Sequence, residues 1–258
     1  MIIGAMNHPM RSVVSEIRRF RELGFDFIDL TLEPEKARPD RLDPLEISAA
    51  LRASGLGIVG HTAWYLPIGS PFDRVREAAI EEMVVCFDLF ARLGAKLINV
   101  HPDPRVPSLF PRDWIVQRNV DSLGRLSGLA EERGVRLMLE NLPGLFNAVD
   151  PLQGMFEALP EIGWHLDVGH ANLGTATNVS GALIDALGSR LCHVHLSDNK
   201  GGDADLHLPL GAGTIDWTWA VDLLRRHGYD DTITLEVFSP DVDYLTASRR
   251  KLRALWDA

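Results

Sequence analysis

Residues 193–213 read HVHLSDNKGGDADLHLPLGAG, a segment that begins with alternating apolar and polar residues and then turns polar and glycine-rich. The alternation extends back to Leu191 and predicts a strand over 191–196, because successive side chains of a strand point to opposite sides. Histidines and aspartates gather where this strand ends. The same pattern, an apolar strand that ends at a histidine or a carboxylate, recurs along the chain, and this repetition indicates the arrangement of the strands and helices.

Seven further strands are predicted, and every strand is followed by a helix. The strands are expected at 2–6, 25–32, 57–61, 96–101, 135–140, 162–167, 191–196 and 232–237. Apolar residues at helical spacing predict helices at 13–23, 44–54, 75–93, 116–130, 151–159, 179–187, 217–224 and 245–256. Eight such units without a linker predict one α/β domain over residues 1–258, a single (β/α)8 TIM barrel. An open doubly wound sheet is the alternative, but the turn GAMNHP after the first strand lacks its glycine-rich phosphate-binding pattern.

The composition fits a globular protein with a sizeable core. Of the 258 residues, 46% are hydrophobic and 24% are charged, and the net charge of −10 argues against a basic nucleic-acid or membrane-surface module. Two cysteines, Cys86 and Cys192, make no disulfide framework and are expected to be buried thiols. No signal peptide and no apolar run near about 18 residues is apparent, so we expect a cytoplasmic protein.

Six consecutive predicted strands end in residue types that bind metal ions. These residues lie 27 to 41 positions apart, one strand–helix unit each time, and are His61, His101, Glu140, Asp167, His195 and Glu236. A closed barrel would bring all six to the rim at its C-terminal end, where catalytic residues of such barrels collect. Imidazoles and carboxylates without thiolates suit Zn²⁺, Mn²⁺ or Fe²⁺ and also admit Mg²⁺. The sequence therefore predicts a metal site.

Other residues are expected near this rim. His170 begins the loop after Asp167, and Asp205 and His207 form an Asp-x-His pair whose side chains would point the same way in an extended loop. One layer deeper, strand alternation points further side chains into the barrel, where they would hold the ligands through hydrogen bonds. These deeper residues are Asn99, His165 and His193, while His8, Trp64 and Lys200 are expected at the rim as substrate contacts.

Seven segments together resemble one family. They are VGHTAWYLPIGSP, LINVHPDP, LMLENLPG, WHLDVGHAN, HVHLSDNKG, DLHLPLGAGTIDW and LEVF, within residues 55–238. The set is similar to the xylose-isomerase-like TIM-barrel superfamily. That superfamily contains sugar and sugar-phosphate isomerases and epimerases, and also the endonuclease IV-type apurinic/apyrimidinic (AP) endonucleases, AP endonuclease family 2.

The two branches imply different site chemistry. Resemblance to the isomerases implies one ion on Glu140, Asp167, His195 and Glu236, with the two glutamates as acid/base groups and His170 touching substrate. Resemblance to the endonucleases implies three zinc ions on nine positions, and all nine carry the expected residue type here: His61, His101, Glu140, Asp167, His170, His195, Asp205, His207 and Glu236. The loop SDNKGGDADLHLPLG and the start GAMNHPM depart from the endonuclease pattern.

We therefore expect a divalent-metal-dependent sugar or sugar-phosphate isomerase or epimerase of carbohydrate metabolism. It would act by proton transfer through a metal-stabilised enediolate, with one to three Zn²⁺, Mn²⁺ or Mg²⁺ ions per chain. The expected partner is a small carbohydrate, with no membrane and a possible homodimer. The alternative is an AP endonuclease that hydrolyses DNA, the only reading with a nucleic-acid partner, and a barrel that binds metal or sugar without catalysis is a third.

Overall fold

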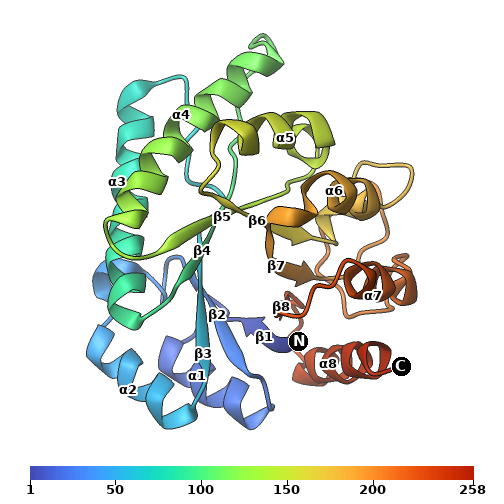
Figure 1. Cartoon of the computed structure of the whole chain (residues 1–258). Helices are drawn as coiled ribbons and strands as arrows, with labels where there is room; N and C mark the ends of the chain where they lie inside the picture. Colours follow the sequence, from blue (N-terminus) through green and yellow to red (C-terminus); the bar gives the residue numbers. More distant parts are fainter.

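The computed structural model describes residues 1–258 and forms a closed barrel of eight parallel strands in sequence order, surrounded by eight helices (Figure 1). The strands are β1 (Ile2–Met6), β2 (Phe27–Leu32), β3 (Gly57–Thr62), β4 (Leu97–Val100), β5 (Arg136–Glu140), β6 (Gly163–Asp167), β7 (Leu191–Leu196) and β8 (Thr232–Leu235). The helices are α1 (Val13–Glu22), α2 (Pro44–Ser54), α3 (Asp73–Leu93), α4 (Arg112–Glu131), α5 (Val149–Ala158), α6 (Ser180–Leu187), α7 (Trp217–Arg226) and α8 (Val242–Trp256). The predicted single (β/α)8 barrel is confirmed.

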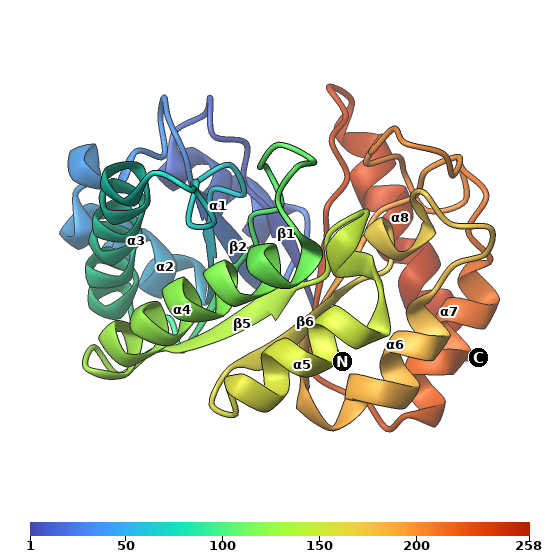
Figure 2. The ribbon, with the colours of Figure 1, turned by 90° about the horizontal axis from the view of Figure 1, so that it is seen from above.

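The first and last strands close the barrel. Strand β1 pairs with β2 on one side and with β8 on the other, so that Gly4 lies opposite both Phe27 and Thr234. A Cβ atom at Gly4 would lie 2.3 Å from the Phe27 ring, and the glycine therefore leaves room for that ring inside the barrel. Seen from the second direction, the helices cover the outside of the strands (Figure 2).

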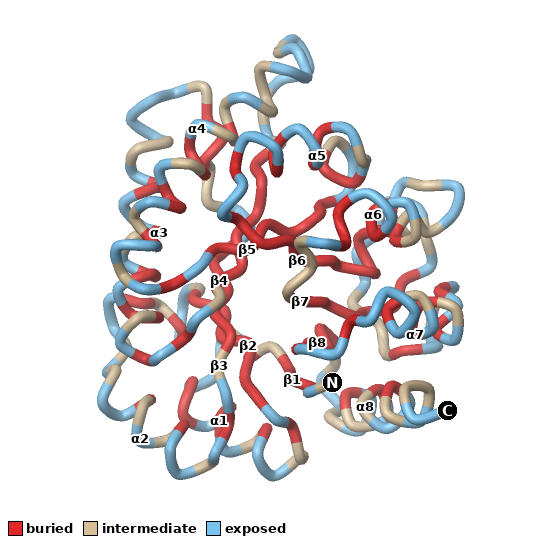
Figure 3. Tube along the Cα trace, viewed as in Figure 1, coloured by how far each residue is buried: buried red, intermediate tan, exposed pale blue.

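Burial follows the layers of the fold. The strands and the inner faces of the helices are buried, whereas the outer faces of the helices are exposed (Figure 3). Inside the barrel, Phe27, Val59 and Met138 pack into a small apolar cluster, with Cys192 against its edge. This cluster fills part of the interior with apolar side chains, and the polar residues of the site occupy the rest. Both cysteines are free, and only Cys86 is fully buried, because Cys192 is partly exposed.

Some boundaries differ from the sequence prediction. Strands β4 and β8 end before His101 and Glu236, although the Glu236 N–H still donates to the Leu196 carbonyl over 3.1 Å and continues the strand pairing. Helices α3 and α4 begin earlier than predicted, because each starts with two charged residues, Asp73 and Arg74 in α3 and Arg112 and Asp113 in α4, that add nothing to the apolar periodicity. None of the helices combines the length and the apolar character that crossing a membrane requires.

Candidate active site

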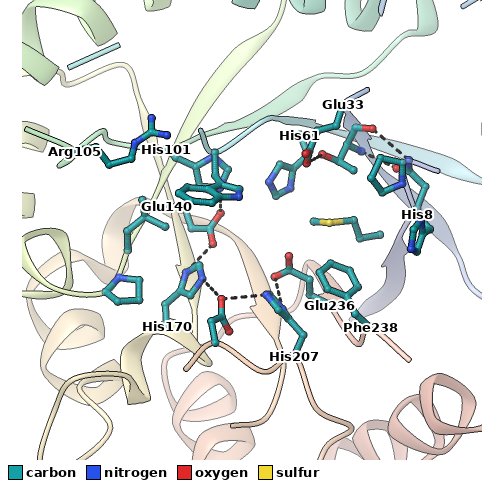
Figure 4. A pocket seen from close by; sticks show the side chains of 18 of the residues that line it. His8, Glu33, His61, His101, Arg105, Glu140, His170, His207, Glu236 and Phe238 are labelled. Carbon is teal, nitrogen blue, oxygen red and sulfur yellow. Dashed lines mark hydrogen bonds and ion pairs between the residues drawn. The ribbon is translucent and has the colours of Figure 1, made fainter. Parts of the chain in front are cut away.

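A cavity of about 600 Å³ opens where the carboxyl ends of the strands meet (Figure 4). Its wall combines imidazoles and carboxylates with aromatic and proline side chains. The lining residues used below are Asn7, His8, Glu33, His61, Trp64, His101, Arg105, Glu140, His170, Asp205, His207, Glu236 and Phe238. Because no single element supplies more than a few of these residues, the cavity depends on barrel closure.

The structure brings together all six residues that were predicted at the strand ends. Glu140 and Asp167 end β5 and β6, while His61 and His195 lie one residue before the ends of β3 and β7. Register aligns them, since Asp167 pairs directly with His195 in the barrel. All six side chains are buried, with relative exposures of 0–8%. They are inward groups at one level of the barrel rather than solvated loop residues.

Glu140 is the centre of one half of the site. One carboxylate oxygen, Oε2, lies 2.9 Å from His101 Nε2 and 3.3 Å from His165 Nδ1, and it also accepts a hydrogen bond from the Asn99 amide. The other oxygen, Oε1, lies 3.0 Å from His170 Nδ1. Burial alone would raise the pKa of Glu140, but these imidazoles hold it well below its usual value. Glu140 is therefore a carboxylate at neutral pH.

His195 and Glu236 form the other half, and Asp167 lies between the halves. His195 Nδ1 is 3.2 Å from Glu236 Oε2 and 3.9 Å from Asp167 Oδ2. Asp167 Oδ2 is also 3.6 Å from His170 Nδ1, on the Glu140 side. Burial raises the pKa of Asp167 to about 7, with the negative charges of Glu140 and Glu236 adding to the increase and His170 opposing it. Asp167 therefore titrates near neutral pH and lies between the two ionised carboxylates of Glu140 and Glu236.

A loop after β7 completes the rim. Asp205 Oδ2 lies 3.1 Å from His170 Nε2 and 3.0 Å from His207 Nε2, and His207 Nδ1 lies 3.6 Å from Glu236 Oε2. The dashed lines in Figure 4 trace this chain from Glu140 to Glu236. Burial lowers the pKa of His207, but the charges of Glu236 and Asp205 outweigh burial and raise it to about 9. His207 has a positive φ of 44°, which is uncommon for a residue other than glycine.

Buried Asp198 anchors this loop. Its carboxylate accepts hydrogen bonds from the Gly211 N–H over 2.7 Å and the Trp217 indole over 2.9 Å. Its backbone pairs in both directions with Leu208, one residue after His207. The chain between Asp198 and Gly211 is thereby tied at both ends, which holds His207 over the cavity.

The donor set fits a divalent cation. Five groups of three histidine or carboxylate residues have ligand atoms within 4.8 Å of one another, and three of them join the predicted ligands: His61 with His101 and Glu140, Glu140 with Asp167 and His170, and Asp167 with His195 and Glu236. Asp167 Oδ2 is buried and accepts no hydrogen bond, which leaves this oxygen available to a cation.

Most of the other predicted site residues also lie at this cavity. Asn99, His165 and His193 are fully buried beneath the rim, and Asn99 contacts Glu140 directly. His8 and Trp64 line the cavity, as expected. Lys200 does not, and its side chain is exposed outside the cavity wall. The reason is that the preceding Asn199 turns inward, where its amide donates to the Gly169 carbonyl over 2.8 Å.

Sequence reasoning missed several residues of the site. Asp29 is fully buried in β2 and contacts three of the site histidines. A signal for Asp29 was available, since it is the one charged residue in the mainly apolar strand FIDLTL, but it lies in the middle of the strand and not at its end. Glu33 and Phe238 also line the cavity, and they come from loops without any pattern. Arg105 lines it too, and the sequence had offered Arg105 only as a basic rim residue for the endonuclease alternative.

Comparison with known proteins gives a family and several relatives. The family described as xylose isomerase-like TIM barrel matches residues 17–255. L-ribulose-5-phosphate 3-epimerase UlaE of Salmonella paratyphi A is 24% identical over 251 residues, which cover 93% of this chain and 87% of UlaE. Protein MJ1311 of Methanocaldococcus jannaschii is 30% identical over 175 residues, 64% of this chain, but the match spans only 58% of MJ1311.

Among solved structures, a D-tagatose 3-epimerase-like protein superimposes with a TM-score of 0.88 at 24% identity, covering 100% of this chain and 97% of that one. At this identity the superposition is a statement about the fold, and it agrees with the closed barrel described above. The family match extends over nearly the whole chain and over every strand-end residue of the cavity. The chain therefore belongs to the xylose isomerase-like TIM barrel family.

Proposed function

We propose that this protein is a divalent-metal-dependent isomerase or epimerase of a small sugar or sugar phosphate. The observation that carries the proposal is the pair of buried carboxylates, Glu140 and Glu236, linked through Asp167, which shares one potential ligand group with each of them. Two carboxylates on one polar cavity can remove a proton from a substrate and return one. The names of the epimerases that resemble this chain support the same reaction class.

The metal ligands we propose are Glu140, Asp167, His195 and Glu236, with His61, His101, Asp205 and His207 available for further ions. A divalent ion held there would polarise the substrate carbonyl and stabilise the enediolate. Zn²⁺, Mn²⁺ and Mg²⁺ are all compatible with nitrogen and oxygen ligands, and the number of ions, one to three, is left to measurement.

The side chains of the protein account for the proton steps. In this proposal one glutamate carboxylate removes the proton next to the carbonyl, and the other first takes a proton from water and then delivers it to the product; the first glutamate afterwards releases its proton to solvent. Both carboxylates are ionised before substrate binds, because imidazoles hold the pKa of each below its usual value despite burial. His170 bridges Glu140 and Asp205 and would contact a substrate hydroxyl, while Asn99 fixes the orientation of Glu140.

The wall of the cavity suits a carbohydrate. Trp64 offers an exposed ring at the mouth, and Glu33 and His8 supply hydrogen-bonding groups. Arg105 is the only lysine or arginine that lines the cavity, and its Nε is already bound to Asp103 Oδ1 over 2.6 Å while its guanidinium lies over the Trp64 ring. A phosphate group would have to share this guanidinium, so we expect an unphosphorylated sugar to be turned over at least as well as its phosphate.

One observation favours the endonuclease alternative. The extra group of His61, His101 and Glu140, together with Asp205 and His207, offers more ligand positions than a single ion needs. Nicking of a duplex that contains an abasic site by the Zn²⁺-loaded protein, with loss of nicking in Glu140→Gln, would establish this alternative. The net charge of −10 and the single cavity-lining arginine oppose DNA binding.

Solvent exchange tests the proposed reaction directly. The protein, loaded with Mn²⁺ or Mg²⁺, is incubated in D₂O with a panel of aldoses, ketoses and their phosphates, and deuterium at carbon is followed by NMR. We expect incorporation next to a carbonyl for at least one sugar and none with EDTA present. Absence of exchange across the panel by fully metal-loaded protein would refute the proposal. The cytoplasmic location and the homodimer stay predictions.

A further inference from the structure

Asp29 lies beneath the proposed ligands and contacts two of them, His61 and His195. Its carboxylate is fully buried in β2. Oδ2 lies 2.8 Å from His195 Nε2, 2.8 Å from the Thr234 hydroxyl and 3.3 Å from His193 Nε2. Oδ1 faces a different strand and lies 3.6 Å from His61 Nδ1. One carboxylate thus contacts imidazoles from β3 and β7.

These contacts decide which ring nitrogen faces the cavity. Because His195 Nε2 must carry a hydrogen to bind Asp29, the other nitrogen, Nδ1, faces Glu236 and Asp167. His61 is arranged in the opposite sense, with Nδ1 toward Asp29 and Nε2 next to the Asn99 amide. The two imidazoles therefore present different nitrogens to the site, and Asp29 is the group on the far side of both.

We propose that Asp29 is a positioning residue that fixes the ring orientation of His195 and His61, and so prepares both halves of the site for a cation. A histidine ligand commonly donates its second ring N–H to a carboxylate, which sets the orientation of the ring and makes it a stronger donor. Here one carboxylate hydrogen-bonds the His195 ring and lies 3.6 Å from the His61 ring as an ion-pair neighbour, so the same group influences the geometry of both. This inference rests on the proposed metal dependence.

Asp29 is not itself a ligand in this account, although it lies within ligand distance of His61 and His195. Its Oδ2 already has two partners at 2.8 Å, and both of these hydrogen bonds would be lost if this oxygen turned to a cation. The Thr234 hydroxyl and His193 Nε2 approach the same oxygen, and His193 is held in turn by the Thr232 hydroxyl over 2.7 Å. This network holds the carboxylate in place beneath the rings.

Binding of Co²⁺ to the full-length chain tests the inference. Affinity is measured by isothermal titration, and the ligand geometry is followed by the visible absorption of the bound Co²⁺. In Asp29→Asn the side chain keeps its size but loses the charge that orients the rings, and we expect the affinity to fall about 10–100-fold with a changed spectrum. The control is Asp185→Asn, the same change at an exposed position of α6, and we expect its affinity to stay close to that of the original protein.

Each outcome decides one question. If the original protein binds no Co²⁺, the proposed metal dependence fails. If it binds Co²⁺ and Asp29→Asn binds equally well with the same spectrum, the positioning role is wrong. If Asp29→Asn does not fold, NMR of ¹⁵N-histidine in the Zn²⁺-loaded original protein takes its place: a proton on His195 Nε2 with metal at Nδ1 supports the inference, and the reverse arrangement overturns it.

Discussion

Replacing Glu140 with glutamine removes the charge on which one half of the site converges. The side chain is 1% exposed and lies within 3.3 Å of three imidazole nitrogens, on His101, His165 and His170. Glutamine has nearly the same shape, so the cavity should persist. It cannot accept the substrate proton, however, and it offers a neutral oxygen where a cation would meet a negative charge.

The size of the effect follows from the roles assigned to this carboxylate. Loss of a positioned acid or base typically costs about 10²–10⁴-fold in rate, which corresponds to about 3–5 kcal/mol of activation free energy. Glu140 also belongs to two of the potential ligand groups, so metal affinity should fall as well. We therefore expect deuterium exchange into the sugar to drop by at least about 10²-fold even at saturating Mn²⁺.

The assay compares Glu140→Gln with Glu81→Gln, which changes an exposed residue of α3 in the same way. Exchange is followed by NMR in D₂O, bound Mn²⁺ by electron paramagnetic resonance, and folding by the melting temperature. The control should behave as the original protein does. Full exchange activity in folded, metal-loaded Glu140→Gln would refute the role of Glu140 as an acid/base group.

Three further predictions concern other parts of the molecule. In EDTA, the free energy of unfolding should fall as the pH rises from about 6.5 to 9, because folded His207, with a pKa of about 9, keeps a proton that the unfolded chain loses near 6.5. Melting temperatures measured across this pH range check the sign of the change. Added Mn²⁺ should make the decline smaller. Gly213→Ala should destabilise the fold by at least about 1–3 kcal/mol, since its Cβ would lie 2.0 Å from the Asn199 carbonyl oxygen. Gly128→Ala has open space around it in α4 and should stabilise the fold by about 0.5–1 kcal/mol. Denaturant titrations measure both changes. Trp64→Ala should raise KM for the sugar about 2–10-fold through lost ring contact and leave Mn²⁺ affinity unchanged, as steady-state kinetics and titration can show; an unchanged KM would remove Trp64 from the substrate site.

The barrel could be predicted because its signal is repeated eight times. Each strand is a short apolar run and each helix shows a wide apolar face, so an error at one boundary leaves the architecture unchanged. The rim residues followed from the same repetition, since strand ends of a closed barrel meet at one edge. Glu140 and Asp167 are both the last residues of their strands, as the pattern required.

Residues whose role depends on contacts across the barrel could not be predicted from the hydrophobic pattern of the sequence. Asp29 is 166 residues from His195 in sequence, and only closure of β1 with β8 and the resulting register bring it beneath that ring. Lys200 shows the opposite error, because a loop residue near a predicted site need not face it. The inward turn of Asn199 depends on a bond to the Gly169 carbonyl, which a single sequence does not reveal.

Metal content is the most direct test of the central claim, that side chains at the carboxyl ends of six strands combine to bind a divalent cation. The protein is purified without chelator, its metals are counted per chain by elemental analysis, and the count is repeated for a variant that carries both His195→Ala and Glu236→Gln. We predict one to three equivalents of Zn²⁺, Mn²⁺ or another divalent metal in the original protein and a clear loss in the folded double variant. A metal-free original protein that takes up no divalent ion on titration, or a double variant with full occupancy, would contradict the account.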